Sequence, residues 1–223
     1  MEERDDGWHV RGFDPSARDT GAFIANPVIP SKAKWIDDSA FSSQSLLTSI
    51  QLNNVEHVCE SAFYSCSNLK QVSNSKYLLD IGNIAFKSCL NLEAVTEVPS
   101  LTAVGDEAFM SCTKLTSFDF SSLKVAGELT FRFCTSLPEL DLPKMVDIGF
   151  GAFSDCSSVT TVSMPSVSDM DGSAFANDLA LKDVDFGSAP LAYLPAHAFV
   201  SCPKVDMLKL NDNLVDLRDD SLA

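Results

Sequence analysis

The chain has no long apolar run and is poor in basic residues. No stretch approaches the roughly 18 apolar residues that a membrane-spanning helix needs. Lysine and arginine number 16 against 31 aspartates and glutamates, which gives a formal net charge of −15. Because nucleic-acid phosphates are bound by clustered lysine and arginine, this balance argues against a nucleic-acid partner. An acidic surface mainly favours solubility and is compatible with a basic protein partner.

Sequence patterns of catalysis are also missing. We find no glycine-rich phosphate loop, no nucleophile elbow and no metalloprotease helix motif. The histidines are His9, His57 and His197, and none is in register with the abundant serines to act as their base. His57, Cys59 and Cys66 lack a second ligand pair at the usual spacing of a zinc site. We therefore expect no enzyme activity, no cofactor and no metal.

The first residues also lack the apolar core of a signal peptide. They read Met-Glu-Glu-Arg-Asp-Asp and are almost all charged. If Met1 is the natural start, we expect the chain to stay inside the cell. If the natural chain begins elsewhere, the sequence leaves the compartment open.

What the chain does contain is a repeated phenylalanine. It recurs every 22 to 24 residues, at Phe41, Phe63, Phe86, Phe109, Phe131, Phe153, Phe175 and Phe199. A period of this length is typical of a solenoid, in which each repeat forms one coil that stacks on the next. Solenoids usually present a long surface to partners, which favours a binding function over catalysis.

Other residues repeat in register with each phenylalanine. Alanine precedes it in seven of eight coils, cysteine follows three residues later in six, and leucine or valine follows six residues later in all. A coil of about 22 residues cannot bury its own apolar side and must stack. We predict a single right-handed leucine-rich-repeat solenoid over residues 23–223, with about eight coils and part of a ninth at Leu214, Leu217 and Leu222.

Residues 1–22 show no repeat register, so we interpret them as an N-terminal tail or cap. Val28 falls in the same column as Ile50 and marks a partial coil before the first. At the other end, only a few polar residues follow the last coil. An uncovered coil exposes a strand edge, so we expect a possible end-to-end contact there.

The alternation in 115–120 and 137–142 is typical of half-buried strands, which would pair between coils into a parallel sheet on one wall. The Ala-Phe-x-x-Cys segment predicts a short helical or 3₁₀ turn on the opposite wall. Gly82, Gly105, Gly127 and Gly149 precede that turn and suggest a left-handed bend, which Pro195 in the same column cannot adopt.

The seven cysteines do not read as a disulfide framework. Cys66, Cys89, Cys112, Cys134 and Cys156 occur once per coil and would point the same way, which disfavours the torsion of a disulfide. We predict free, buried thiols. Cys59 lies outside this column and is the candidate reactive thiol, although ordinary turn packing is the preferred interpretation.

The repeat carries the pattern Ala-Phe-x-x-Cys-x-x-Leu-x-x-Val with an upstream Ile-Gly, which is nearly complete over 81–95. Through this pattern it resembles the BspA-like (treponemal-type) leucine-rich repeat. The resemblance covers about residues 23–222. It departs from the pattern at Asp178, which replaces a cysteine, and at Ala126 and Thr130. It implies a surface protein of a bacterium or parasitic protist that adheres to host molecules or other cells.

The outward face of the predicted strands is the candidate partner-binding surface. Its central and C-terminal part carries Ser117, Asp119, Glu139, Asp141, Thr161, Ser163, Asp183 and Asp185. Three interpretations remain open, namely a solvated strand face, an acidic stripe for a basic protein, and a calcium site. The face has no tryptophan, tyrosine or arginine, the types that dominate tight interfaces.

Two functional hypotheses follow for this non-catalytic interaction solenoid. One is a ligand-recognition or adhesion segment of a surface protein. The other is an intracellular scaffold or structural subunit of a larger assembly, favoured by the cysteines and the missing signal peptide.

Overall fold

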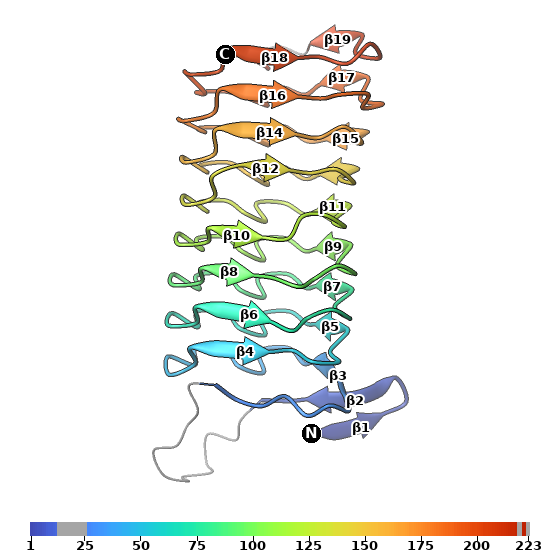
Figure 1. The fold of residues 1–223 in the computed structure, drawn as a ribbon, viewed down its shortest axis with the longest axis vertical. Coiled ribbons are helices and arrows are strands. Elements are labelled where there is room, and N and C mark those ends of the chain that lie inside the picture. The colour runs from blue at the N-terminus through green and yellow to red at the C-terminus, as the bar shows by residue number, and fades with distance from the viewer. Residues whose placement is uncertain (13–25, 218–219, 222–223) are drawn as a thin grey trace.

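The chain winds into right-handed coils that stack along one axis, as the computed structural model shows in Figure 1. The structure describes residues 1–12, 26–217 and 220–221. Each coil crosses three walls, which we call the first wall, the second wall and the turn wall. Within the described residues all regular elements are short strands, and no helix there could span a bilayer.

The first wall consists of short parallel strands in two sheets. The first sheet contains β4 (Ser49–Gln51), β6 (Gln71–Ser73), β8 (Ala94–Val95) and β10 (Ser117–Phe118). The second contains β12 (Leu140–Asp141), β14 (Thr161–Ser163), β16 (Asp183–Asp185) and β18 (Met207–Lys209). The strands bury their middle apolar column and turn the neighbouring residues outward, as the alternation predicts, and only in β18 is that column residue, Leu208, partly buried.

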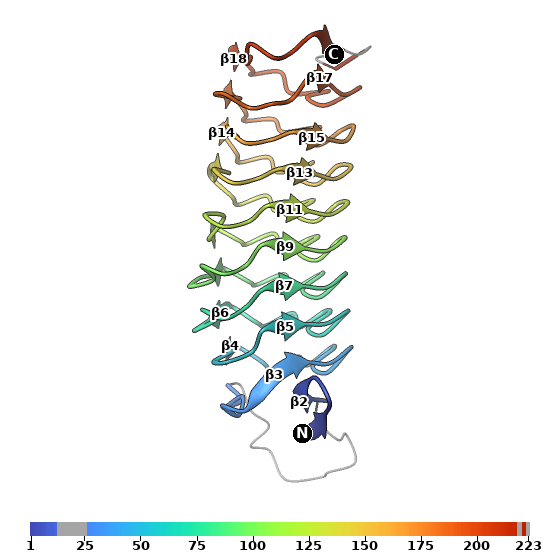
Figure 2. The ribbon, with the colours of Figure 1, turned by 90° about the vertical axis from the view of Figure 1, so that its right-hand side faces the viewer.

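The second wall is a longer sheet that the sequence analysis did not predict; it faces the viewer in Figure 2. Its order is β1 (Glu2–Arg4), β2 (Gly7–Val10), β3 (Ala33–Ile36), β5 (His57–Val58), β7 (Asp80–Ile81), β9 (Ala103–Val104), β11 (Val125–Ala126), β13 (Asp147–Ile148) and β15 (Asp169–Met170). A separate pair, β17 (Tyr193–Leu194) and β19 (Asp216–Leu217), follows. Among the strands that the structure describes, only β1 is antiparallel to its neighbour.

The turn wall is not helical, and the predicted helical or 3₁₀ turn is therefore wrong. The residues two before and two after each phenylalanine have positive φ, for example Ser61 at 55° and Ser65 at 55°. Their N–H groups and that of Phe63 donate to carbonyls of the next coil, at 2.9, 2.9 and 2.7 Å. These three N–H groups point along the solenoid axis, so they cannot form the hydrogen bonds of a helical turn within their own coil. The turn wall thus adds a third ladder of hydrogen bonds between coils.

The glycine column serves close packing and not a left-handed bend, so that prediction was also wrong. Positive φ occurs two residues later, at positions such as Ile84 and Leu129. A Cβ at Gly149 would lie 2.7 Å from the backbone carbon of Gly127 and 2.8 Å from the Glu128 nitrogen. Glycine is needed there because the preceding coil leaves no room for a side chain.

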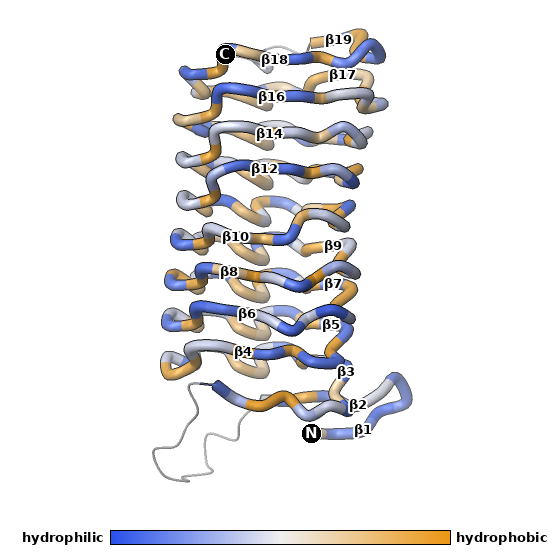
Figure 3. The backbone as a smooth tube through the Cα atoms, viewed as in Figure 1, coloured by the Kyte–Doolittle hydropathy of each residue, from blue (hydrophilic) through white to orange (hydrophobic). Residues whose placement is uncertain are grey.

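The core is a continuous stack of phenylalanine rings. From Phe41 to Phe199, neighbouring ring centroids lie 4.9 to 5.5 Å apart and the planes differ by 2 to 8°. The alanine that precedes seven of the eight phenylalanines is buried and leaves space for the rings. Figure 3 shows the hydropathy pattern returning from coil to coil. Since each ring packs mainly on its two neighbours, stability is built coil by coil.

The cysteines are free thiols, as predicted. Each thiol in the repeated column donates to the phenylalanine carbonyl of the preceding coil, at 2.9 to 3.3 Å between sulfur and oxygen. Burial raises the pKa of the Cys66 thiol to about 11, which keeps the proton that this bond requires. The column is thus a ladder of hydrogen-bond donors as well as a set of small apolar groups.

Near the N-terminus the predicted register is wrong by one residue. Val28 bridges to Gln51 instead of lying beside Ile50, and its side chain is 85% exposed. Ile29 takes the buried position, at 2% exposure. A shift of one residue exchanges the two faces of a strand, and Pro27 and Pro30 lack the N–H groups that would enforce the regular register.

At the other end, Leu217 pairs with Leu194, as its column requires. Leu222 and residues 13–22 of the N-terminal segment lie outside the described residues.

The first wall is divided between β10 and β12, which belong to different sheets. Figure 1 shows a wider gap between these two strands than between the other neighbours of the wall. The Thr116 N–H donates to the Glu93 carbonyl of the preceding coil at 3.0 Å. The residue at the same repeat position in the next coil is Pro138. Proline has no N–H to continue that ladder toward Thr116. Phe118 and Phe120 pack on Phe131 at 5.0 and 5.3 Å and fill the core beside the step.

Candidate functional site

A shallow groove of about 550 Å³ lies on the first wall across β12, β14, β16 and β18. Its floor is the buried column of Leu140, Val162 and Val184. Its two sides are the outward columns on either side of that floor. They contain Glu139, Thr161, Asp183 and Met207 on one side, and Asp141, Ser163, Asp185 and Lys209 on the other.

The groove follows from strand register. Leu140 pairs with Val162, which pairs with Val184, which pairs with Leu208. In-register parallel pairing places equivalent outward residues of successive coils directly above one another, one strand spacing of about 4.8 Å apart. The groove therefore runs along the solenoid axis, across the strands.

Acidic residues face each other across the groove on two of its four strands. Glu139 and Asp141 flank Leu140, while Asp183 and Asp185 flank Val184. The small hydroxyl residues of β14 separate these two acidic rungs. Like charges placed this close repel each other, and a bound cationic group would relieve that repulsion.

The four carboxylates differ in their partners. Asp185 accepts from Lys209 Nζ at 2.9 Å and from the Gly187 N–H at 2.6 Å, and these bonds hold the pKa of its carboxyl below the usual value. The carboxylates of Glu139, Asp141 and Asp183 make no hydrogen bond or ion pair with any residue that the structure describes. They are thus the groups available to an external cation.

Six of the eight residues that the sequence singled out line this groove, namely Glu139, Asp141, Thr161, Ser163, Asp183 and Asp185. Ser117 and Asp119 do not, because the division of the first wall separates their coil from β12. The Asp119 carboxylate also accepts the Ser121 N–H at 3.0 Å, which satisfies it locally.

Met207 and Lys209 line the groove as well, and the candidate set did not include them. They occupy the same two outward columns in the next coil, so the repeat register could have identified them. They change the chemistry at this end of the groove, where Lys209 neutralises Asp185 and Met207 adds an apolar surface that is 59% exposed.

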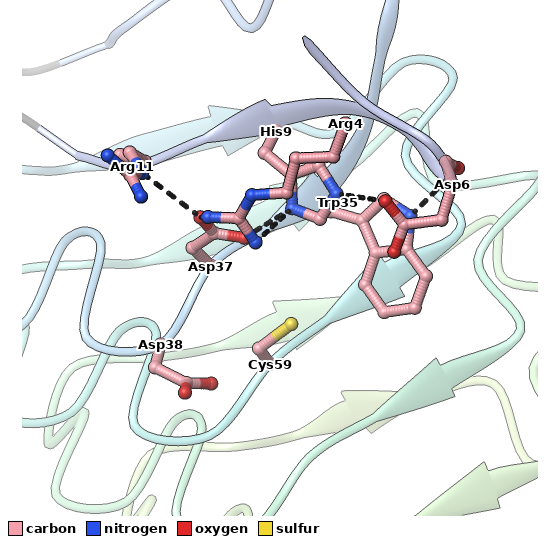
Figure 4. A pocket seen from close by; sticks show the side chains of 8 residues that line it. All are labelled: Arg4, Asp6, His9, Arg11, Trp35, Asp37, Asp38 and Cys59. Carbon is pink, nitrogen blue, oxygen red and sulfur yellow. Dashed lines mark hydrogen bonds and ion pairs between the residues drawn. The ribbon is translucent and has the colours of Figure 1, made fainter. Parts of the chain in front are cut away.

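A second cavity, of about 480 Å³, lies at the N-terminal end and is shown in Figure 4. It is lined by Arg4, Asp6, His9, Arg11, Trp35, Asp37, Asp38 and Cys59. The His9 ring stacks on Trp35, with 5.4 Å between centroids, and Trp35 stacks on His57 at 3.9 Å. Sequence reasoning missed this cluster because residues 1–12 have no repeat pattern that would place them.

Cys59 opens into this cavity but lacks the character of a reactive thiol. Burial and the negative charges of Asp38, Asp37 and Asp80 raise its pKa to about 11. The thiolate, which is the nucleophilic form, is therefore scarce near neutral pH. Turn packing, the preferred interpretation of this residue, agrees with that environment.

His57, Cys59 and Cys66 do not converge on one point. His57 Nδ1 lies 2.7 Å from Asp80, and the buried Cys66 donates to the Phe41 carbonyl. Among the residues that the structure describes, no three histidine, cysteine or acidic side chains are grouped so as to hold a metal ion.

Comparison with known families identifies the repeat. The profile of the BspA type leucine rich repeat region, in six copies, matches residues 21–138 and 124–223. No curated protein sequence matches the chain.

The chain is also similar to solved structures of leucine-rich repeat proteins and of a bacterial antigen. A leucine rich repeat protein of T. pallidum is 23% identical over 86% of this chain and 77% of that chain, with a TM-score of 0.51. A leucine rich cell surface protein of Faecalibacterium prausnitzii is 20% identical over 90% of this chain and 79% of that chain, with a TM-score of 0.38. The pneumococcal vaccine antigen PcpA is 15% identical over 94% and 72%, with a TM-score of 0.39. The first similarity supports the solenoid fold, and the other two superpose too loosely to support more.

Proposed function

The chain belongs to the BspA-type leucine-rich repeat family, and from this premise we propose that it is a non-catalytic recognition solenoid that binds a basic protein segment in the groove of the first wall. Leucine-rich repeat solenoids typically present a surface to protein partners. The observation that carries the proposal is the pair of acidic rungs with three unpartnered carboxylates, those of Glu139, Asp141 and Asp183.

The spacing of the two rungs specifies the partner further. They lie on β12 and β16, with β14 between them, so two strand spacings separate them, or roughly 10 Å. A peptide in the extended polyproline II conformation advances about 3.1 Å per residue with three residues per turn, so basic side chains three residues apart lie on one face and span a similar distance. The groove thus suits an extended segment with lysine or arginine at positions i and i+3, lying along the solenoid axis.

Peptides test this fit directly. We expect a labelled extended peptide with two lysines three residues apart to bind more tightly than one of the same composition with the lysines adjacent. Binding should weaken with added salt, because exposed charges are screened. Chelation of calcium should leave it unchanged, and dependence on calcium would instead favour a cation site.

Charge reversal locates the site. We expect Asp141→Lys together with Asp183→Lys to weaken the peptide by about tenfold or more, since two attractions become repulsions. Asp147→Lys together with Asp169→Lys is the matched control, because it makes the same change in net charge with exposed residues of the second wall. An equal loss of peptide affinity in both double variants would mean that only net charge matters. Unchanged affinity in the groove variant would exclude the groove as the binding site.

We further propose that the chain acts as an adhesion or recognition segment of a surface protein, with an intracellular scaffold as the second candidate. The family supports the first, and the free thiols favour the second. An antibody to the solenoid, applied to separated surface and soluble fractions of the source cells, distinguishes them. A band well above 24.1 kDa in the surface fraction supports the adhesin, and a 24.1 kDa band in the soluble fraction supports the scaffold.

A further inference from the structure

The β1–β2 hairpin is held to the solenoid mainly by polar groups. Strand β2 pairs with β3 and so covers the edge of the second wall. Within the hairpin strands only His9 and Val10 are buried. Every later coil instead packs a phenylalanine and several aliphatic side chains against its neighbour. Attachment of the hairpin therefore depends far more on charge than the stacking of the coils does.

His9 is the centre of that attachment. Its side chain is 3% exposed, and Nδ1 lies 2.5 Å from Asp37 Oδ1 while Nε2 lies 2.8 Å from Asp6 Oδ1. A carboxylate can only accept, so both contacts are hydrogen bonds only if both ring nitrogens carry protons. The geometry fits the imidazolium, and a neutral ring would turn one lone pair toward a carboxylate. Figure 4 shows the ring between the two acids.

The surrounding charges favour the same form. Arg4 is the opposing cation, with Nη1 3.2 Å from His9 Nδ1, but its Nη2 is bonded to Asp37 at 2.8 Å. Arg11 Nε pairs with Glu2 at 2.6 Å. Asp38 and Cys59 line the same cavity. Across Trp35, His57 has its own partner in Asp80 at 2.7 Å.

We propose that the β1–β2 hairpin is a pH-sensitive cover for the edge of β3, docked while His9 is protonated between Asp6 and Asp37 and released when His9 loses its proton. Release would expose the backbone donors and acceptors of β3, which is an edge prepared to pair with another strand. The change at His9 is local, and the coils beyond β3 keep their own contacts.

The direction of the effect follows from linkage. Burial lowers the pKa of His9, but its hydrogen bonds to Asp37 and Asp6 and the charge of Asp37 outweigh this, and the net pKa is raised above 6.5. A raised pKa in the docked state means that the stabilisation is complete below the unfolded value and is lost as the pH rises through the docked value. Docking is thus expected in mildly acidic solution and release in alkaline solution.

Hydrogen exchange of the full chain tests the proposal. We expect the amides of β2, after correction for intrinsic exchange, to open about tenfold more at pH 8 than at pH 5, because one of the two charge-assisted hydrogen bonds of His9 is lost with its proton. His9→Gln should leave them open at both pH values. Asp6→Asn should keep them protected at both, because the asparagine amide can donate to the Nε2 of a neutral ring. His197→Gln, on the turn wall, should behave like the wild type.

Three results would overturn the proposal: equal protection of β2 at both pH values in the wild type, a pH dependence that persists in His9→Gln, or one that disappears in His57→Gln while His9 is intact. Asp6→Asn separates protonation from a merely structural role. If groups other than His9 cause the pH dependence, Asp6→Asn keeps it in full, and this fourth result would also overturn the proposal.

Discussion

At the scale of single residues, Asp178 is the main exception in the cysteine column. Its Oδ1 accepts the Cys156 N–H at 2.7 Å, while its buried Oδ2 has no partner among the described residues. Burial raises the pKa of this carboxyl well above 3.8. A buried polar atom without a partner costs roughly 1–3 kcal/mol. The residue therefore lowers stability at a position where other coils have a thiol donor.

Replacing Asp178 with cysteine should restore the ladder of donors. We expect Asp178→Cys to raise the free energy of unfolding by about 1–2 kcal/mol at neutral pH, because the unsatisfied oxygen is removed and the new thiol can bond the Phe153 carbonyl. Denaturant titration of both proteins measures the difference. A destabilised variant would mean that the bond to Cys156 outweighs the buried oxygen.

The same pair of proteins makes a prediction about pH. Because the pKa of Asp178 is raised in the folded state, keeping its proton costs no stability below the unfolded value of 3.8. The free energy of unfolding then falls as the pH rises toward the folded pKa. The stability difference between Asp178→Cys and the wild type should thus increase from pH 3 upward. Melting temperatures of the two proteins across this range check it, and a difference that does not vary with pH would contradict it.

Residue identity alone did not predict the turn wall. Ile84 and Leu129 have φ of 59° and 54°, a conformation that branched and bulky side chains avoid. Their N–H groups donate to Asp106 and Phe150 of the next coil at 2.8 and 2.9 Å, and these bonds offset the local strain. Local propensity therefore favoured a helical turn, while contacts between coils determined the observed one.

At the scale of elements, the contact between coils explains the glycine column. We expect Gly149→Ala to destabilise the fold by about 1–3 kcal/mol, because its Cβ would meet the Gly127 backbone at 2.7 Å. Gly172→Ala is the control, since its nearest atom is the Ala196 oxygen at 3.0 Å and the next lie at 3.9 Å. Thermal melts should show a clear loss for the first variant and a small change for the second.

Pro138 is the element-scale feature that separates β10 from β12. We expect Pro138→Thr to supply the missing N–H to Thr116 and to increase hydrogen-exchange protection of β10 and β12. The gain in the free energy of unfolding should stay below about 1 kcal/mol. Without the proline the unfolded chain has more conformational entropy, and this offsets much of the new hydrogen bond. Unchanged protection would indicate that the packing of Phe118 and Phe120, and not the proline, sets the division.

These elements show how far the sequence was sufficient. The phenylalanine stack, the thiol column and the outward acidic columns follow from periodicity, because each is a property of every coil. The division at Pro138 and the loss of Ser117 and Asp119 from the groove depend on how one coil meets the next. The His9 cluster joins residues outside the repeat to the first coils, so no column could reveal it.

At the scale of the whole molecule, the question is whether the groove depends on distant coils. Two ladders and the phenylalanine stack cross the division at Pro138, as Val125 pairs with Ala103 and the Phe109 N–H donates to the Thr130 carbonyl. Each of these contacts nevertheless links only adjacent coils. In such an array, energies are sums of coil terms and nearest-neighbour terms. Damage far from β12 should thus lower overall stability without changing the groove.

Phe63→Ala tests this separation of stability from binding. Removing this buried ring should cost about 3–5 kcal/mol, because it leaves a cavity in the stack between Phe41 and Phe86. At a temperature where the variant is still folded, its affinity for the basic peptide should match the wild type within about twofold. Phe175→Ala removes the equivalent ring from the coil between β14 and β16 and should weaken both stability and binding. Isothermal titration of the two variants decides the matter: if Phe63→Ala loses affinity as Phe175→Ala does, the solenoid acts as one coupled body, and the groove is not a local property of β12 to β18.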